Sequence, residues 1–174
     1  IGVVAAFFVF YMLVRLILGI FGYSQHYRHK KTDTTLLSGI KAYFEGNYVK
    51  AQKNAGTALK LTDSPIITAV SAVIAARSAH ELDDTKVRDQ YIATALRKAP
   101  TEKSLSLMAK ADFLLSDGHH QEALETLHSL YANGGLQPSS ALQLELRAQQ
   151  QANNWDAVLE LANILAKRPS TNQT

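Results

Sequence analysis

Histidine and acidic side chains are the groups in this chain that could support metal or acid–base chemistry. The sequence has six His and no Cys among 174 residues, which excludes disulfides, cysteine-ligated zinc, Fe–S clusters and cysteine nucleophiles. His80-Glu81 begins like the zinc motif H-E-x-x-H, but Asp84 stands where the second His is required. His119-His120 is interpreted as a solvated turn, with metal ligation as the weaker alternative. We therefore predict no metal site.

Glycine spacing limits the cofactors that the chain can bind. The nine glycines contain no G-x-G, so a dinucleotide or flavin fold of the usual kind is excluded. No Walker loop is present either. The adjacent carboxylates of Asp83-Asp84 are interpreted as the start of a helix, where exposed backbone amides favour acids. No residue therefore stands out as catalytic, and we expect a protein that is not an enzyme and has no resident cofactor.

The net charge of +3 is not spread evenly along the chain. Four of the 18 Lys and Arg residues, and none of the 15 Asp and Glu residues, lie before residue 32, so the remainder carries a net charge of −1. Nucleic-acid binding requires a cationic surface on the folded domain. The sequence leaves no excess positive charge for such a surface, so nucleic acid is not an expected partner.

The first 22 residues are almost entirely apolar, interrupted only by Arg15. A helix over residues 1–22 spans about 33 Å at about 1.5 Å per residue, enough to cross a bilayer core of about 30 Å. A helix ending at Arg15 is too short, and a start at Ile1 suggests that part of the segment is missing. A signal peptide has its charged region before the apolar run, whereas here a basic stretch follows it. We predict a transmembrane helix over 1–22 and a basic juxtamembrane linker over 23–33, with the cytoplasm beyond them; a buried helix is the weaker alternative.

A repeat occupies the rest of the chain. Apolar residues recur at three- and four-residue spacings, which indicates helices. Similar helix-opening segments begin at Gly46, Asp83, Gly118 and Asn153, which are 37, 35 and 35 residues apart. Helix pairs with a period near 34 are typical of tetratricopeptide repeats. The predicted fold is therefore all-α, a tetratricopeptide-type helix-pair solenoid over 34–168 preceded by a transmembrane helix and followed by a polar tail over 169–174.

The small residues of the repeat are expected where the two helices of a pair cross closely. Ala51 and Ala123 occupy this position in two of the units, whereas Arg88 occupies it in the second, which predicts either a wrong register or a splayed pair there. Trp155 is expected to anchor the final helix by packing. The predicted helices cover residues 34–45, 48–61, 66–82, 86–98, 102–115, 121–131, 139–152 and 155–167, with Asp33 and Thr101 as N-caps of the first and fifth.

The first helices of the pairs should line a concave groove that binds a partner. Arg77 and Arg147 are suited to bind a carboxylate of a peptide or a porphyrin propionate. Alternatively, each forms an ordinary surface pair within its own helix, with Glu81 and Gln143 respectively. The full set of predicted groove residues is Val73, Arg77, His80, Met108, Asp112, Gln143, Arg147 and Gln150.

Three segments carry a family resemblance: residues 42–48 (AYFEGNY), 75–82 (AARSAHEL), and 144–149 (LELRAQ) with 154–156 (NWD). On these segments the chain resembles the HemY family of bacterial inner-membrane proteins. The resemblance implies transmembrane helices, cytoplasmic tetratricopeptide repeats, a location at the bacterial inner membrane and an association with late haem (protoporphyrin) biosynthesis. It also implies that the chain starts inside the second transmembrane helix and stops before the later repeats.

The expected function is a membrane-anchored scaffold that binds a protein partner, by resemblance one of the haem pathway. The alternative is a haem- or porphyrin-handling protein or a component of a porphyrinogen-oxidising enzyme. A porphyrinogen oxidase of this kind requires a flavin, and the glycine motif that binds a flavin is missing from the sequence. Haem needs an axial ligand in an apolar pocket, and His80 is the candidate ligand, with Val73 and Arg77 nearby. We predict weak or no specific haem binding.

Overall fold

A computed structural model describes residues 31–132 and 138–167. Every regular element within these ranges is a helix, so the all-α prediction is confirmed for them. The predicted transmembrane helix, nearly all of the basic linker and the polar tail lie outside the described residues. Among the helices of the described ranges, none combines the length and the apolar character that a membrane crossing requires.

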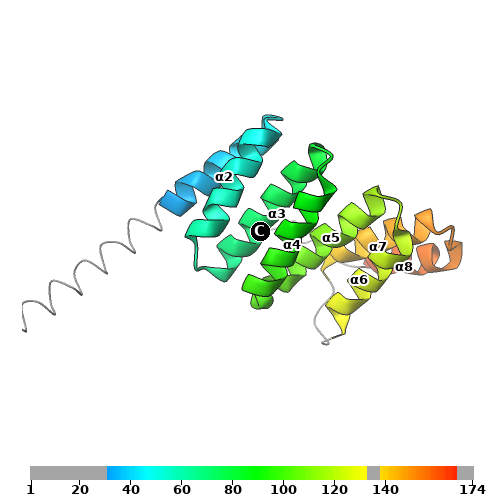
Figure 1. Cartoon of the computed structure of the whole chain (residues 1–174). Coiled ribbons are helices and arrows are strands. Elements are labelled where there is room, and N and C mark those ends of the chain that lie inside the picture. The colour runs from blue at the N-terminus through cyan, green and yellow to red at the C-terminus, as the bar shows by residue number, and fades with distance from the viewer. Residues whose placement is uncertain (1–30, 133–137, 168–174) are drawn as a thin grey trace, which may run out of the picture.

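The helices follow one another as antiparallel pairs (Figure 1). Residues 31–44 are helical and pair with α2 (Tyr48–Leu61). The side-chain amide of Asn54 on α2 donates a hydrogen bond to the Ser38 hydroxyl across this pair at 3.0 Å. The remaining elements are α3 (Pro65–Glu81) with α4 (Thr85–Lys98), the 3-10 turn η1 (Pro100–Glu102), α5 (Lys103–Ser116) with α6 (His120–Tyr131), and α7 (Ser139–Gln151) with α8 (Trp155–Lys167).

The pairs stack side by side in chain order, as in a helix-pair solenoid. The first helices form one row, in which α3 packs on α5 and α5 on α7. The second helix of each pair packs on the first helix of its own unit and, except for α8, on that of the next. Figure 1 shows this progression from the N-terminal to the C-terminal end. We call the row of first helices the inner row, since the groove described below lies on it.

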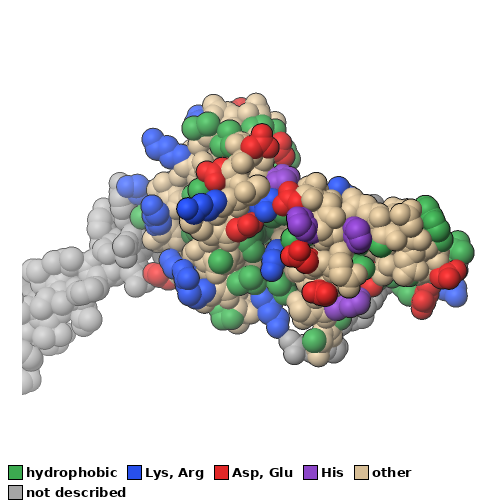
Figure 2. All heavy atoms as spheres, turned by 45° about the vertical axis from the view of Figure 1, so that its right-hand side comes forward, with side chains coloured by type: hydrophobic (Ala, Val, Ile, Leu, Met, Phe, Trp, Pro, Cys, Tyr) green, Lys and Arg blue, Asp and Glu red, His purple; other side chains and the backbone are tan. Residues whose placement is uncertain are grey.

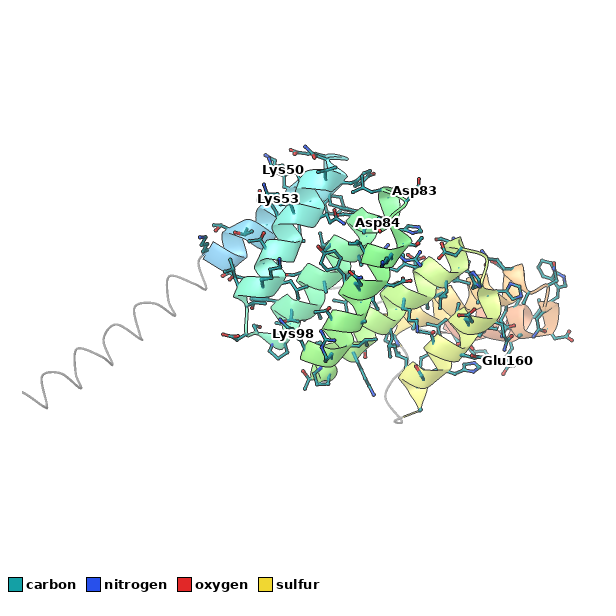
Figure 3. All side chains as sticks on the ribbon, viewed as in Figure 1. Lys50, Lys53, Asp83, Asp84, Lys98 and Glu160 are labelled. Carbon is teal, nitrogen blue, oxygen red and sulfur yellow. The ribbon has the colours of Figure 1, made fainter. Side chains whose placement is uncertain are left out.

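The turns inside the pairs repeat the same backbone conformation. Gly46, Asp83, Gly118 and Asn153, whose spacing defined the repeat, have φ of +75°, +56°, +82° and +56°. This left-handed region favours Gly and is tolerated by Asn and Asp. The next residue then caps the following helix in two of the units: Asp84 Oδ1 accepts from the Val87 amide at 3.0 Å and Asn47 Oδ1 from the Lys50 amide at 3.2 Å. Asp83 and Asp84 therefore serve as turn and N-cap, and Figure 3 shows both at the turn between α3 and α4.

Three local predictions differ from the structure. The first helix is already helical at residue 31, so Asp33 lies inside it and is not its N-cap. The fifth begins at Lys103 after a 3-10 turn that includes Thr101, because Pro100 favours a tight turn before the helix. The side chain of Trp155 is 60% exposed, so it is not a packing anchor within the described residues.

Close helix crossings are filled by small residues, as the repeat pattern predicts. Ala51 and Ala123 are fully buried, each four residues after the cap position of its helix. Arg88 stands at the same distance from its N-cap Asp84 and is only 5% exposed. The register of the second unit is therefore right, and its pair accommodates an arginine where the first and third units bury an alanine.

Two glycines at helix crossings differ in what surrounds them, which predicts a contrast in stability. A Cβ at Gly39 would lie 3.1 Å from the backbone nitrogen of Ala55, which cannot rotate away. At Gly56 it would meet only the hydroxyl of Tyr91, the free end of a side chain. Alanine improves helix propensity by about 1 kcal/mol at either site, while overpacking against backbone costs about 1–3 kcal/mol.

We therefore expect Gly39→Ala to lower the free energy of unfolding by about 1 kcal/mol, and Gly56→Ala to leave it nearly unchanged or to raise it. Urea unfolding followed by circular dichroism measures both variants. Equal stability of the two variants would contradict the crossing geometry.

Candidate partner-binding groove

A cavity of about 480 Å³ opens on the inner row between α3, α5 and α7. Its size falls within the range of ligand pockets in proteins. Six of the eight predicted groove residues line it: Val73, Arg77, Met108, Asp112, Gln143 and Arg147. The other lining residues are Leu105, Ala109, Ser140 and Leu144. The cavity therefore combines an apolar floor with charged groups from three successive units.

The charged groups are joined through Asp112. Arg77 Nη1 donates to Asp112 Oδ2 at 3.0 Å, and Arg147 Nη1 donates to Asp112 Oδ1 at 3.1 Å. The arginines thus pair across the units rather than within their own helices, and the predicted pairing of Arg77 with Glu81 is wrong. We call Arg77, Asp112 and Arg147 the groove triad. With two cations and one anion, the triad has a formal charge of +1.

The triad belongs to a row of equivalent positions. Tyr43, Arg77, Asp112 and Arg147 follow one another at 34, 35 and 35 residues, which is the period of the repeat. Burial raises the pKa of the Tyr43 hydroxyl, and the nearby Arg77 guanidinium partly opposes this rise. Arg77 therefore lies between Tyr43 on the first helix and Asp112 on α5, so that one row of polar groups runs along all four first helices.

A second polar group, centred on the buried Arg88, lies where the second and third units meet. Arg88 Nη1 donates to Asp117 Oδ2 at 2.7 Å and Arg88 Nε to Asp89 Oδ1 at 2.8 Å. The guanidinium carbon lies 5.3 Å from the centre of the Phe113 ring, in the range of a cation–π contact. Burial lowers the pKa of Arg88, but its hydrogen bonds to the two aspartates outweigh this effect and raise it. We call Arg88, Asp89, Asp117, His80 and Phe113 the Arg88 cluster.

His80 belongs to this cluster and not to the groove, which corrects its predicted position. Its ring lies 5.1 Å from that of Phe113, and its Nδ1 is 3.3 Å from Arg88 Nη1. Since an arginine only donates, the contact requires an unprotonated Nδ1. Gln150 is exposed and also lies outside the cavity lining. Both residues stand in the last turn of their helices, beyond the part of the inner row that the cavity covers.

The remaining described histidines lie at the surface. His119 Nδ1 is 3.2 Å from Glu122 in the first turn of α6, and His128 Nε2 is 3.5 Å from Glu145. No three His, Asp or Glu side chains come together as a metal site within the described ranges. On the face shown in Figure 2, the histidines lie near the middle of the molecule, and Lys and Arg side chains are most frequent towards its N-terminal end.

Sequence reasoning missed Tyr43 and the role of Arg88. Tyr43 could have been found by extending the 35-residue spacing of Arg77, Asp112 and Arg147 one unit towards the N-terminus. Arg88 was noticed as a departure from the alanine pattern, and the acidic turn residue Asp117 one unit later was the available sign of a partner.

One known family covers the part of the chain that builds the first half of this inner row. Residues 1–83 match the family described as HemY protein N-terminus. This part of the chain is similar to the N-terminal region of HemY proteins. It contains Tyr43 and contributes Val73 and Arg77 to the cavity. The HemY match agrees with the resemblance of the sequence and associates the chain with haem biosynthesis. No curated protein and no solved structure matches the chain.

Proposed function

We propose that the chain is a membrane-attached helical-repeat scaffold of the tetratricopeptide type. Its inner row binds a segment of a protein that acts in haem biosynthesis. The observation that carries this proposal is the cavity formed jointly by α3, α5 and α7. The HemY match supplies the link to the haem pathway. The apolar run over residues 1–22 and the basic juxtamembrane linker that follows it support attachment to the bacterial inner membrane, with the repeats in the cytoplasm.

The lining of the cavity suits binding better than catalysis. An apolar floor with a few placed polar groups is the usual composition of a recognition site. Both oxygens of Asp112 already accept from guanidinium groups, so this carboxylate is not free to act as a base. The Ser140 hydroxyl donates to the Met108 sulfur at 3.4 Å and has no base beside it among the lining residues. We therefore propose a role without enzymatic activity.

Site-specific photocrosslinking in cells tests the proposal. The photoreactive residue benzoylphenylalanine is placed at position 143, which lies at the exposed edge of the cavity, in the full chain. The matched control carries it at position 125, exposed on α6 in the preceding unit. We expect a discrete crosslinked protein from position 143 that is lost when Met108→Lys places a charge on the cavity floor. The same crosslinks from both positions, or none from position 143, would contradict a partner in the groove.

Haem binding is the alternative that the HemY association suggests, and His80 was its candidate ligand. His80 contacts Arg88 and Phe113 and is not among the residues that line the cavity, whereas axial ligation of haem needs a histidine aimed into an apolar pocket. We expect titration of the full chain with haem to give a diffuse Soret change that His80→Ala leaves unaltered. His128→Ala, at the surface, is the matched control. A saturable shift at one equivalent that disappears only in His80→Ala would favour haem handling.

A further inference from the structure

The groove triad is a carboxylate site that one of the chain's own residues fills. Each guanidinium donates a single hydrogen bond to Asp112 through Nη1, although the group carries five N–H donors in a planar fork. The side chains of Arg77 and Arg147 are 37% and 47% exposed, and that of Asp112 is 22% exposed. Further donors of both arginines are therefore available to a ligand that enters the cavity from the open side.

We propose that the groove recognises an acidic side chain next to an apolar one in a partner segment, and that Asp112 competes with this ligand for the two arginines. The inference rests on the proposed function, since it names the chemistry of the partner bound at the same cavity. The formal charge of +1 on the triad becomes zero when one carboxylate is added, so charge complementarity selects an anionic group.

The apolar floor sets the second requirement. Val73, Leu105, Met108 and Leu144 border the same cavity as the two arginines. Leu105, Met108 and Leu144 are only partly buried and therefore offer apolar packing surface to a ligand. A ligand with only a carboxylate would leave this surface in water, whereas an aliphatic or aromatic neighbour would bury it at a gain of about 25 cal/mol per Å². Leu, Ile, Met or Phe adjacent to Asp or Glu satisfies both parts of the cavity.

The carboxylate should come from a side chain and not from a chain end. The row of polar groups continues beyond the cavity to Tyr43 on the first helix. A bound segment is therefore able to run along the inner row past the triad, and the structure provides no reason for it to end there.

Selection from a random dodecapeptide library tests the inference on the full chain in detergent. The peptides are displayed within a loop of a carrier protein, so that neither end is free. We expect enrichment of Asp or Glu beside Leu, Ile, Met or Phe. For the most enriched peptide, Arg147→Gln should weaken binding about two- to fivefold, and Asp112→Asn should tighten it by a similar factor, as for partly exposed ion pairs. Arg97→Gln, exposed on α4, is the matched control.

The outcomes separate this inference from the proposed function. Binders that lose affinity in Met108→Lys but carry no acidic residue would overturn the inference and leave a protein-binding groove. Acidic binders that are insensitive to both Arg147→Gln and Asp112→Asn would also overturn it. Enrichment that appears only when the library is displayed with free C-termini would assign the carboxylate to a chain end. The absence of any binder sensitive to Met108→Lys would count against the groove itself.

Discussion

Replacing Arg88 with alanine should lower the free energy of unfolding by about 2–4 kcal/mol. The side chain is 5% exposed and holds Asp117, whose side chain is only 27% exposed, at 2.7 Å. Removing one partner of a buried ion pair leaves the other partly desolvated and typically costs about 3–5 kcal/mol. The cost is smaller here because the Asp117 carboxylate retains some access to water. The cation–π contact with Phe113 and the packing of the aliphatic stem are lost as well.

Thermal and urea unfolding of the full chain, followed by circular dichroism, measure this effect. For a chain of this length we expect the thermal midpoint to fall by about 5–15 °C. Arg97→Ala is the matched control, because Arg97 lies on the same helix and is exposed. Arg88→Ala and Arg97→Ala should therefore differ by at least about 2 kcal/mol. Comparable stabilities of the two variants would show that the Arg88 cluster contributes little to the junction of the second and third units.

A double-mutant cycle with Asp117→Ala separates the ion pair from the packing. If the pair carries most of the effect, removing both residues should cost clearly less than the sum of the single changes, with a coupling of about 1–3 kcal/mol. The hydrogen bonds that raise the pKa of Arg88 keep it charged throughout the usual pH range, so its titration should not make this coupling depend on pH.

The repeat could be predicted from the sequence because its turns are local. Gly46, Asp83, Gly118 and Asn153 all need a left-handed backbone, and only a few residue types adopt it readily. Their spacing therefore revealed the period without any knowledge of tertiary contacts. The helix ends followed within a few residues, including the start of α5, although a short 3-10 turn at Pro100 precedes it.

The positions of the groove residues on the inner row could also be predicted, but their partners could not. Helical periodicity places Arg77 and Asp112 on equivalent faces of successive first helices. It does not say that they meet across 35 residues of sequence, because the distance between units depends on how the pairs stack. The sequence therefore suggested an i,i+4 pair of Arg77 with Glu81, which is local and looks equally plausible.

The contacts of His80 could not be predicted from the sequence for the same reason. Its position at the end of α3 is compatible with the groove, but the ring packs on Phe113, which comes from the next unit. Arg88 also contacts the His80 ring, with 3.3 Å between Nη1 and Nδ1. Composition and periodicity do not predict this arrangement, because it joins residues of both helices of one unit to Phe113 of the next.

A large side chain at Ala123 should disrupt the crossing of α5 and α6. Ala123 is fully buried and packs in one apolar cluster with Ala111, Leu115 and Leu127. Tryptophan there requires space that close-packed interiors do not contain, so Ala123→Trp should cost about 1–3 kcal/mol or more in the free energy of unfolding. Ala93→Trp, on the exposed side of α4, is the matched control and should be nearly neutral.

Ala123→Trp and Ala93→Trp introduce the same side chain into a helix and differ mainly in the burial of the site. Their effects on helix propensity are therefore similar and cancel in the comparison. Urea unfolding of both variants measures the difference. Arg88 marks the equivalent position of the second unit, and there the structure holds a long side chain by giving its charged end two carboxylates. In the third unit, Ala123 instead belongs to an apolar cluster with Ala111, Leu115 and Leu127. Unchanged stability of Ala123→Trp would therefore mean that this unit also opens enough to accept a large side chain, and that its helices are not packed as closely as the buried alanines indicate.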